Sequence, residues 1–204
     1  MRGRVGMSRG WMLIAALALS SACGSRPPDE SNYVDGIATA RAAKDAAFRG
    51  VGSPVPAEAQ AKLLPLAYFP IDPLYAVPAA FREVPPEARQ RVEIQTSTHQ
   101  TRQMERLGTL DFTLQGQALK LAAYREVGQS ADHLFVPFTD LTTGKETYQA
   151  GRFLDIDRSV TGIYVVDFNT AYNPYCCYNP TYDCPYPPKE NRLPLAIRAG
   201  EKVK

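Results

Sequence analysis

The sequence predicts a mainly β domain, an antiparallel barrel or sandwich that is preceded by one or two N-terminal helices and followed by an ordered C-terminal loop. Short runs rich in β-branched and aromatic residues recur between residues 91 and 168, separated by glycine-containing turns, as in antiparallel β folds. Apolar residues follow helical spacing over residues 32–49. Residues 172–188 hold five tyrosines, five prolines and three cysteines, a composition that no helix or central strand tolerates.

Basic residues followed by an apolar run predict a secretory signal at residues 1–22. Three arginines precede the nine apolar residues 11–19, a run too short to span a bilayer. Cys23 follows small residues, as in the lipobox of bacterial lipoproteins, although Ser20 stands where an aliphatic residue is usual. We therefore expect a cell-envelope lipoprotein that is anchored to a membrane through acylated Cys23, with palmitate as an acyl group. Cleavage after Ala22 by the ordinary signal peptidase would instead give a periplasmic protein.

The charge of the mature chain gives no sign of a nucleic-acid partner. The 204 residues include 23 basic and 21 acidic side chains. Without the three arginines of the signal, 20 basic side chains face 21 acidic ones, a net charge of about −1. Nucleic-acid binding favours strongly basic surfaces, so we expect none here. The length suits one domain, with residues 23–31 as a polar tether and 32–204 as a mainly β domain with an N-terminal helix.

The N-terminal part of this domain is expected to be helical and then extended. Residues 32–49 predict an amphipathic helix with Asn32 as N-cap and Gly50 at its end, and residues 58–64 predict one or two further turns. The stretch 65–78 contains four prolines. Because each proline removes a backbone donor, this stretch predicts an extended edge segment.

The β region is expected to contain eight strands, at 91–97, 102–107, 109–114, 119–126, 133–138, 146–150, 152–156 and 163–168. Thr143-Gly144 predicts the turn of a hairpin between Phe138 and Tyr148. Gly151 stands where a bulge could redirect the chain into the next strand.

Residues 172–188 predict an ordered loop, because disordered segments are poor in aromatic residues and rich in charge. An exported chain meets an oxidising compartment, so its cysteines are interpreted first as disulfide partners. Adjacent cysteines bridge each other poorly. Either Cys176 or Cys177 is therefore expected to pair with Cys184, and the other stays free. The two histidines, His99 and His133, lie far from the cysteines, so we expect no metal and no other cofactor.

Polar residues at the predicted strand ends and in this loop are candidates for binding a small ligand. Such groups converge at the mouth of a β-barrel when it captures a ligand. The same residue types also cap backbone groups, and Arg152 could simply pair with Asp167 to hold the loop down. The ligand-binding candidates are Arg152, Asp167, Asn169, Tyr172, Asn173, Asn191 and Arg192.

Three classes of function remain open at this stage. The first is an envelope protein that binds an unknown small molecule or an envelope protein partner under the disulfide-pinned loop. The second is a hydrolase or thiol-dependent enzyme that uses Tyr172, Asp167 or a free cysteine, although the chain has no nucleophile elbow, zinc motif or phosphate-binding loop. The third is a structural interaction module, which would present an apolar surface to a partner.

A distinctive set of residues marks the C-terminal third, residues 135–202. They are Thr143, Gly144, Gly151, Arg152, Phe153, Asp167, Phe168, Asn169, Tyr172, Asn173, Pro174, Cys176, Cys184, Pro187, Pro188, Asn191, Ala199, Gly200, Glu201 and Lys202. In these residues the chain resembles the bacterial family named domain of unknown function 1684, and the resemblance is weaker upstream. Thr170 and Cys177 depart from the family pattern, which has a basic and a small residue there. The first change weakens an anion clamp, and the resemblance itself implies no particular activity.

Overall fold

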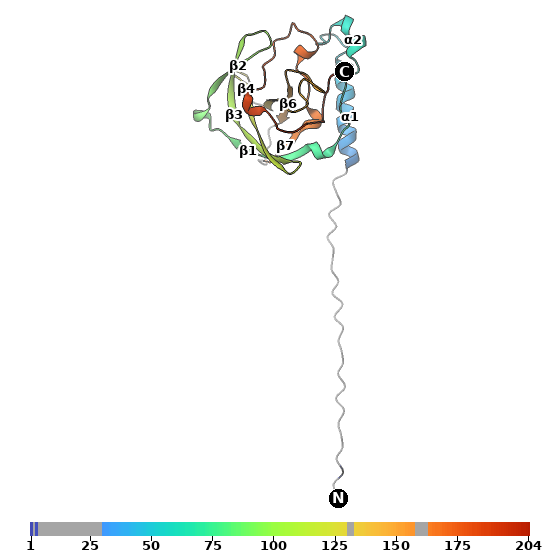
Figure 1. Cartoon of the computed structure of the whole chain (residues 1–204), viewed down its shortest axis with the longest axis vertical. Helices are drawn as coiled ribbons and strands as arrows, with labels where there is room; N and C mark the ends of the chain where they lie inside the picture. Colours follow the sequence, from blue (N-terminus) through green and yellow to red (C-terminus); the bar gives the residue numbers. More distant parts are fainter. Residues whose placement is uncertain (2, 4–29, 130–132, 158–162) are drawn as a thin grey trace.

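The computed structural model describes residues 1, 3, 30–129, 133–157 and 163–204 (Figure 1). The predicted signal cleavage site, the lipid attachment site Cys23 and the tether up to residue 29 lie outside the described residues. Export and lipid anchoring therefore stay predictions.

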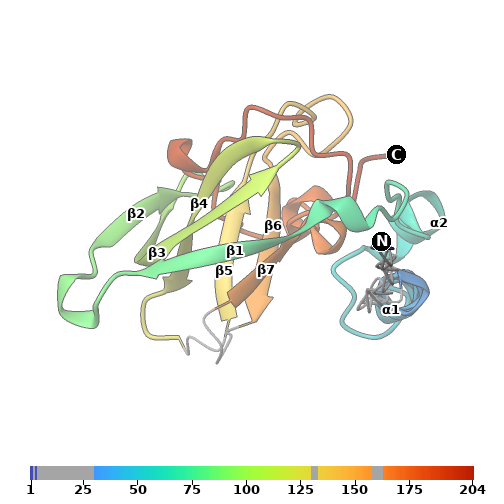
Figure 2. The same cartoon turned by 90° about the horizontal axis from the view of Figure 1, so that it is seen from below.

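Two helices precede the sheet, as the sequence predicts: α1 (Glu30–Ala47) and α2 (Ala57–Leu63). The first begins two residues before the expected N-cap Asn32 and ends before Gly50. Both helices lie on the same side of the β-sheet (Figure 2). Phe48 follows α1 directly and packs edge-on against Tyr178 of the C-terminal loop, with ring centroids 5.5 Å apart. This contact holds the helical side of the molecule to residues 172–188.

None of the helices within the described residues is both long and apolar enough to span a membrane.

The described strands form one antiparallel sheet that curls into a nearly closed barrel, which confirms the predicted fold class. The order is β6-β5-β4-β3-β1-β7, with β2 paired to β3. The outermost strands of this order, β6 and β7, lie beside each other and bring the barrel close to closure. The bounds are β1 Ala76–Glu83, β2 Arg91–Gln95, β3 Thr101–Leu114, β4 Gln117–Glu126, β5 His133–Phe138, β6 Arg152–Asp157 and β7 Ile163–Asp167.

The runs 102–107 and 109–114, which we expected to be two strands, are one long strand, β3. Its first half pairs with β2 and its second half with β1. The register against β4 shifts between Arg106 and Gly108. A Cβ atom at Gly108 would lie 2.4 Å from the carbonyl oxygen of Arg82. Glycine therefore allows the close approach of β1 at the point where β3 bends.

Two further expectations about the strands are wrong. Residues 146–150 form turns rather than a strand, because the carbonyl oxygen of Thr142 accepts hydrogen bonds from the backbone of Lys145, Glu146 and Thr147 and coils the chain. The turn at Thr143-Gly144 does form, and Gly144 has a φ of +76°. The proline-rich stretch 65–78 contributes to an interior strand rather than an edge, since β1 has β3 on one side and β7 on the other. Pro78 lies opposite Val165 in the β7 ladder and one residue before the β3 ladder begins at Ala79.

Both faces of the sheet between β4 and β6 are covered. Along β6, Leu154 and Ile156 point into the main barrel core, whereas Phe153 belongs to a separate cluster with Cys176 and Cys184. Side chains alternate between the two faces of a strand, so residues 172–188 lie against the outer face of the barrel.

The last residues of the chain complete the inner core. Leu193, Leu195, Ile197 and Ala199 are buried with the inward side chains of the strands. The C-terminal region therefore contacts both faces of the barrel sheet. Residues 172–188 cover the outer face, and residues 193–199 fill the interior.

Candidate functional site

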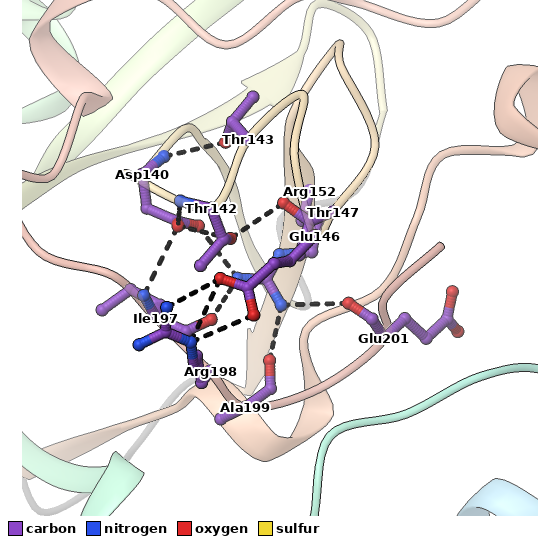
Figure 3. A network of polar contacts seen from close by, with 10 residues as sticks. All are labelled: Asp140, Thr142, Thr143, Glu146, Thr147, Arg152, Ile197, Arg198, Ala199 and Glu201. Atoms are coloured by element: carbon purple, nitrogen blue, oxygen red, sulfur yellow. Dashed lines mark hydrogen bonds and ion pairs between the residues drawn. The ribbon is translucent and has the colours of Figure 1, made fainter. Parts of the chain in front are cut away.

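The candidate Arg152 is a buried anchor for the C-terminus. Its guanidinium donates to the carbonyl oxygens of Ile197, Ala199 and Glu201 and forms an ion pair with Asp140 at 2.9 Å (Figure 3). Its side chain is 1% exposed. Arg152 thus pairs with Asp140 and not with Asp167, the partner that we considered from the sequence. Burial lowers the pKa of the Arg152 guanidinium, and the charge of Asp140 opposes this effect. Because the ordinary pKa of arginine is very high, the guanidinium stays protonated.

The candidates Asp167 and Asn169 attach α1 to the end of β7. The Asp167 carboxylate accepts hydrogen bonds from the hydroxyl of Tyr33 at 2.8 Å and from the backbone N–H of Asn169 at 2.9 Å. The Asn169 amide donates to Tyr33 and to the carbonyl of Asp72. Burial, followed by the bond to Asp167, raises the pKa of the Tyr33 phenol. This network holds helix and strand together.

Asn191 fills a gap in the sheet. The strands β4 and β5 share a single directly opposed pair, Tyr124 and Phe135. The fully buried Asn191 side chain accepts from Ala122 N–H at 2.7 Å and donates to the carbonyls of Ala122 and Pro137 at 2.8 Å each. It thereby replaces missing ladder bonds, which satisfies polar backbone groups that would otherwise be buried without partners. Its neighbour Arg192 is exposed.

Glu201 connects the loop, α1 and the C-terminus. Its buried carboxylate accepts hydrogen bonds from the backbone of Asn173 at 2.9 Å, from the hydroxyl of Tyr178 and from the ammonium of Lys44. Burial raises the pKa of the Tyr178 phenol, and the charge of Glu201 raises it further. The candidate Asn173 therefore contributes its backbone N–H to this junction.

The larger of two cavities described lies between the outer face of the barrel and the loop. It has a volume of about 600 Å³, within the usual size of a small-ligand site. Its aromatic side chains come from the residue after α1, from β4, β5 and β6, and from the loop. They are Phe48, Tyr124, Phe135, Phe153, Tyr172, Tyr175 and Tyr182. Tyr172 is the candidate that lines it. We expected a site at the barrel mouth, and this cavity lies on the outer face instead.

A smaller cavity of about 180 Å³ lies between α1 and the start of the loop. It is lined by the candidates Asn169 and Tyr172, together with Arg41, Tyr68 and Glu201. The candidates Arg152, Asp167, Asn173, Asn191 and Arg192 line neither cavity.

A carboxylate, a phenol and an imidazole meet in the wall of the larger cavity. The hydroxyl of Tyr172 donates to Asp155 at 2.7 Å, and the imidazole Nε2 of His133 lies 3.5 Å from the same carboxylate. Burial and the charge of Asp155 raise the pKa of the Tyr172 phenol. Sequence reasoning missed Asp155, Phe153 and Phe135. Their signal was the period-2 alternation of β5 and β6, which places each of them on the outer face.

The expected disulfide is not formed in the structure. Cys176, Cys177 and Cys184 are all free thiols. The backbone N–H of Cys176 donates a hydrogen bond to the Cys184 sulfur at 3.2 Å. The two residues are therefore in contact without a covalent bond. Hydrogen bonds fix this part of the loop in place of a disulfide, because the backbone of Cys184 is bonded to Ser97 in both directions.

The thiols differ in their tendency to ionise. A hydrogen bond from the Cys184 thiol, with a further one from Tyr148, lowers the pKa of Cys176 to about 6. Burial, with the charge of Glu201, raises the pKa of Cys177 to about 12. His133 contacts Asp155 and not a cysteine, so the imidazole does not serve as the base of a thiol nucleophile in this arrangement. The residues that the structure describes contain no group of three or more potential metal ligands.

The comparison with family models gives the family. The model for Protein of unknown function (DUF1684) matches residues 62–202, which is more than half of the chain. The chain belongs to this family. The DUF1684 match begins in α2 and ends at Lys202. It therefore includes every described strand, residues 172–188 and the loop residues that line the two cavities.

A solved structure has the same fold as this DUF1684 protein. It is the solution NMR structure of an uncharacterized protein of Haloarcula marismortui, with 34% sequence identity and a TM-score of 0.68. The alignment covers 86% of this chain and 96% of that chain. No curated protein matches the sequence.

Proposed function

We propose that the protein binds a small organic ligand in the larger cavity, between the outer face of the barrel and residues 172–188. The observation that carries this proposal is a cavity of about 600 Å³ whose wall combines seven aromatic rings with charged and polar side chains, most of the charged ones already in ion pairs. Small-molecule sites have this composition, because aromatic surfaces supply burial and polar groups fix orientation.

The shape of the cavity is supported by contacts across its wall. Phe153 packs edge-on against Phe135 and Tyr172, with centroids 4.9 and 5.9 Å apart, and Tyr175 packs against Tyr182 at 5.3 Å. Backbone hydrogen bonds in both directions join Phe153 to Tyr172. A wall that is fixed before binding loses little conformational entropy when a ligand enters.

We further propose that the protein acts in the cell envelope, exported by the signal at residues 1–22 and tethered through lipid on Cys23. The sequence of the signal and its small-residue exit support this. Metabolic labelling with palmitate tests it. Label should enter the wild-type chain and be absent from the Cys23→Ser variant, and label in both variants would contradict anchoring at this residue.

Ligand binding is tested by thermal-shift screening of envelope metabolites against matched variants. A ligand at a hundred times its Kd stabilises a protein by about 2.7 kcal/mol, which raises the Tm of a domain of this size by roughly 5–10 °C. Tyr175→Ala should abolish the shift, because Tyr175 lines the cavity. Tyr186→Ala is the control, since this tyrosine of the same loop is similarly exposed, 38% against 44%, and lies outside the wall. Equal shifts in both variants would contradict the proposed site.

A further inference from the structure

The cationic side chains that line the larger cavity are already paired. They are Lys44, Arg102 and Arg125. Their ion-pair partners are Glu201 for Lys44, Glu126 and Asp183 for Arg102, and Glu105 for Arg125. An anionic ligand would have to compete with these carboxylates for each cation.

One lining carboxylate has no such partner. Asp155 accepts the Tyr172 hydroxyl and lies 3.5 Å from the imidazole of His133. Among the residues that the structure describes, no lysine or arginine forms an ion pair with it, and its side chain is 43% exposed. Three carboxylates, Glu126, Asp155 and Asp183, line the cavity beside the three cations, and Asp155 is the one of them without a lysine or arginine ion pair among the described residues. The lining charge that no lysine or arginine neutralises is therefore that of Asp155.

The aromatic rings add a second attraction for positive charge. The face of an aromatic ring carries negative potential and attracts a cation within about 6 Å of the centroid. The wall already uses this property, because the ammonium of Lys44 lies 5.0 Å from the centroid of Tyr172 and 5.2 Å from that of Phe48. Phe153 touches Tyr172 and lies two residues before Asp155 on the outer face of β6. The aromatic surface and the carboxylate of Asp155 are therefore adjacent.

We propose that the ligand of this cavity is an organic cation, an amine or quaternary ammonium with an apolar body. Its charged head lies beside Asp155 and Tyr172, and its body packs against the rings of Phe153 and Tyr175. This inference rests on the proposed ligand-binding function and names the chemical class that the same site takes. A carboxylate without a cationic lysine or arginine partner, set within an aromatic wall, binds such a cation by charge and ring attraction together.

Three probes that share a phenylbutyl body test the class: 4-phenylbutyltrimethylammonium, 4-phenylbutanol and 5-phenylpentanoate. Calorimetric titration at low salt gives their Kd values for the purified protein, and NMR shifts of the aromatic rings locate each probe. The cationic probe should bind about tenfold or more tightly than the neutral one, the factor that corresponds to 1.4 kcal/mol. The anionic probe should bind most weakly.

Matched variants separate this inference from the proposed function. Asp155→Asn should weaken the cationic probe about tenfold and leave the neutral probe unchanged. Asp157→Asn is the control, because Asp157 lies on the same strand and face but does not line the cavity. Tyr175→Leu keeps apolar volume while it removes a ring, and it should weaken the cationic probe more than the neutral one.

The outcomes are distinct. If the anionic or neutral probe binds in the cavity as tightly as the cation, or if Asp155→Asn changes nothing, the organic-cation inference is overturned while the proposed binding function stands. If no probe binds up to millimolar concentration and no metabolite shifts the Tm, both are overturned.

Discussion

Removing the guanidinium of Arg152 should destabilise the protein strongly. Arg152→Met keeps the apolar stem of the side chain but leaves the carbonyls of Ile197, Ala199 and Glu201 without their donor and takes the ion pair from Asp140. Removing one partner of a buried ion pair destabilises a protein by about 3–5 kcal/mol. The carboxylate of Asp140 keeps the hydrogen bonds from Thr142, so we do not expect a larger loss.

Urea unfolding at neutral pH measures this loss. With an m-value of about 2 kcal/mol per M, a loss of about 4 kcal/mol lowers the unfolding midpoint by roughly 2 M urea. Arg198→Met is the matched control, because Arg198 forms a two-pronged ion pair with Glu146 that is exposed to solvent (Figure 3). Its midpoint should stay unchanged, since exposed pairs contribute little. Similar midpoints for the two variants, or a loss below about 1 kcal/mol in Arg152→Met, would refute the reasoning.

Three further predictions concern the loop and its surroundings. Gly151→Ala should lower the unfolding free energy measured in urea by roughly 3 kcal/mol, because φ is +85° and the added Cβ would lie 2.5 Å from the carbonyl oxygen of Phe138. The control is Gly116→Ala, which has a φ of +75° and open space around the added Cβ, and it should lower the unfolding free energy by about 1 kcal/mol. Above pH of about 10 the unfolding free energy should fall, since burial raises the pKa of phenols such as Tyr178 and the unfolded chain loses their protons first. Urea unfolding at a series of pH values measures this, and an unfolding free energy that stays constant above that pH would contradict it. Alkylation of unfolded protein without reductant should modify Cys176, Cys177 and Cys184 alike, and a pair that reacts only after reduction would show a disulfide.

The local features of this fold were predictable from the sequence. Hydrophobic spacing predicted α1, and the β-prone run at residues 133–138 predicted β5 with the bounds that the structure has. The run 146–150 was mistaken for a strand because its conformation depends on Thr142. The Asp140 carboxylate accepts the backbone N–H of Thr142, and the Thr142 carbonyl accepts the N–H groups of the residues that follow, which turns the chain. A β-prone composition alone does not show such a competing set of hydrogen bonds.

The roles of the candidate residues depended on partners far away in the chain. Arg152 binds carbonyls 45–49 residues later, and Asn191 binds Ala122, 69 residues earlier. Local spacing contains no information about these contacts. The cavity was expected under residues 172–188, where it lies, but at the mouth of the barrel rather than on its outer face. The sequence does not show that residues 172–188 return to the outer face of β5 and β6 while residues 193–199 enter the barrel.

The location of a bound ligand tests the central claim most directly. A crystal structure of the protein with the ligand that gives the largest thermal shift should show it between β6 and the loop, in contact with Phe153, Tyr172 and Tyr175. A ligand bound elsewhere, with this cavity still empty at saturating concentration, would contradict the account.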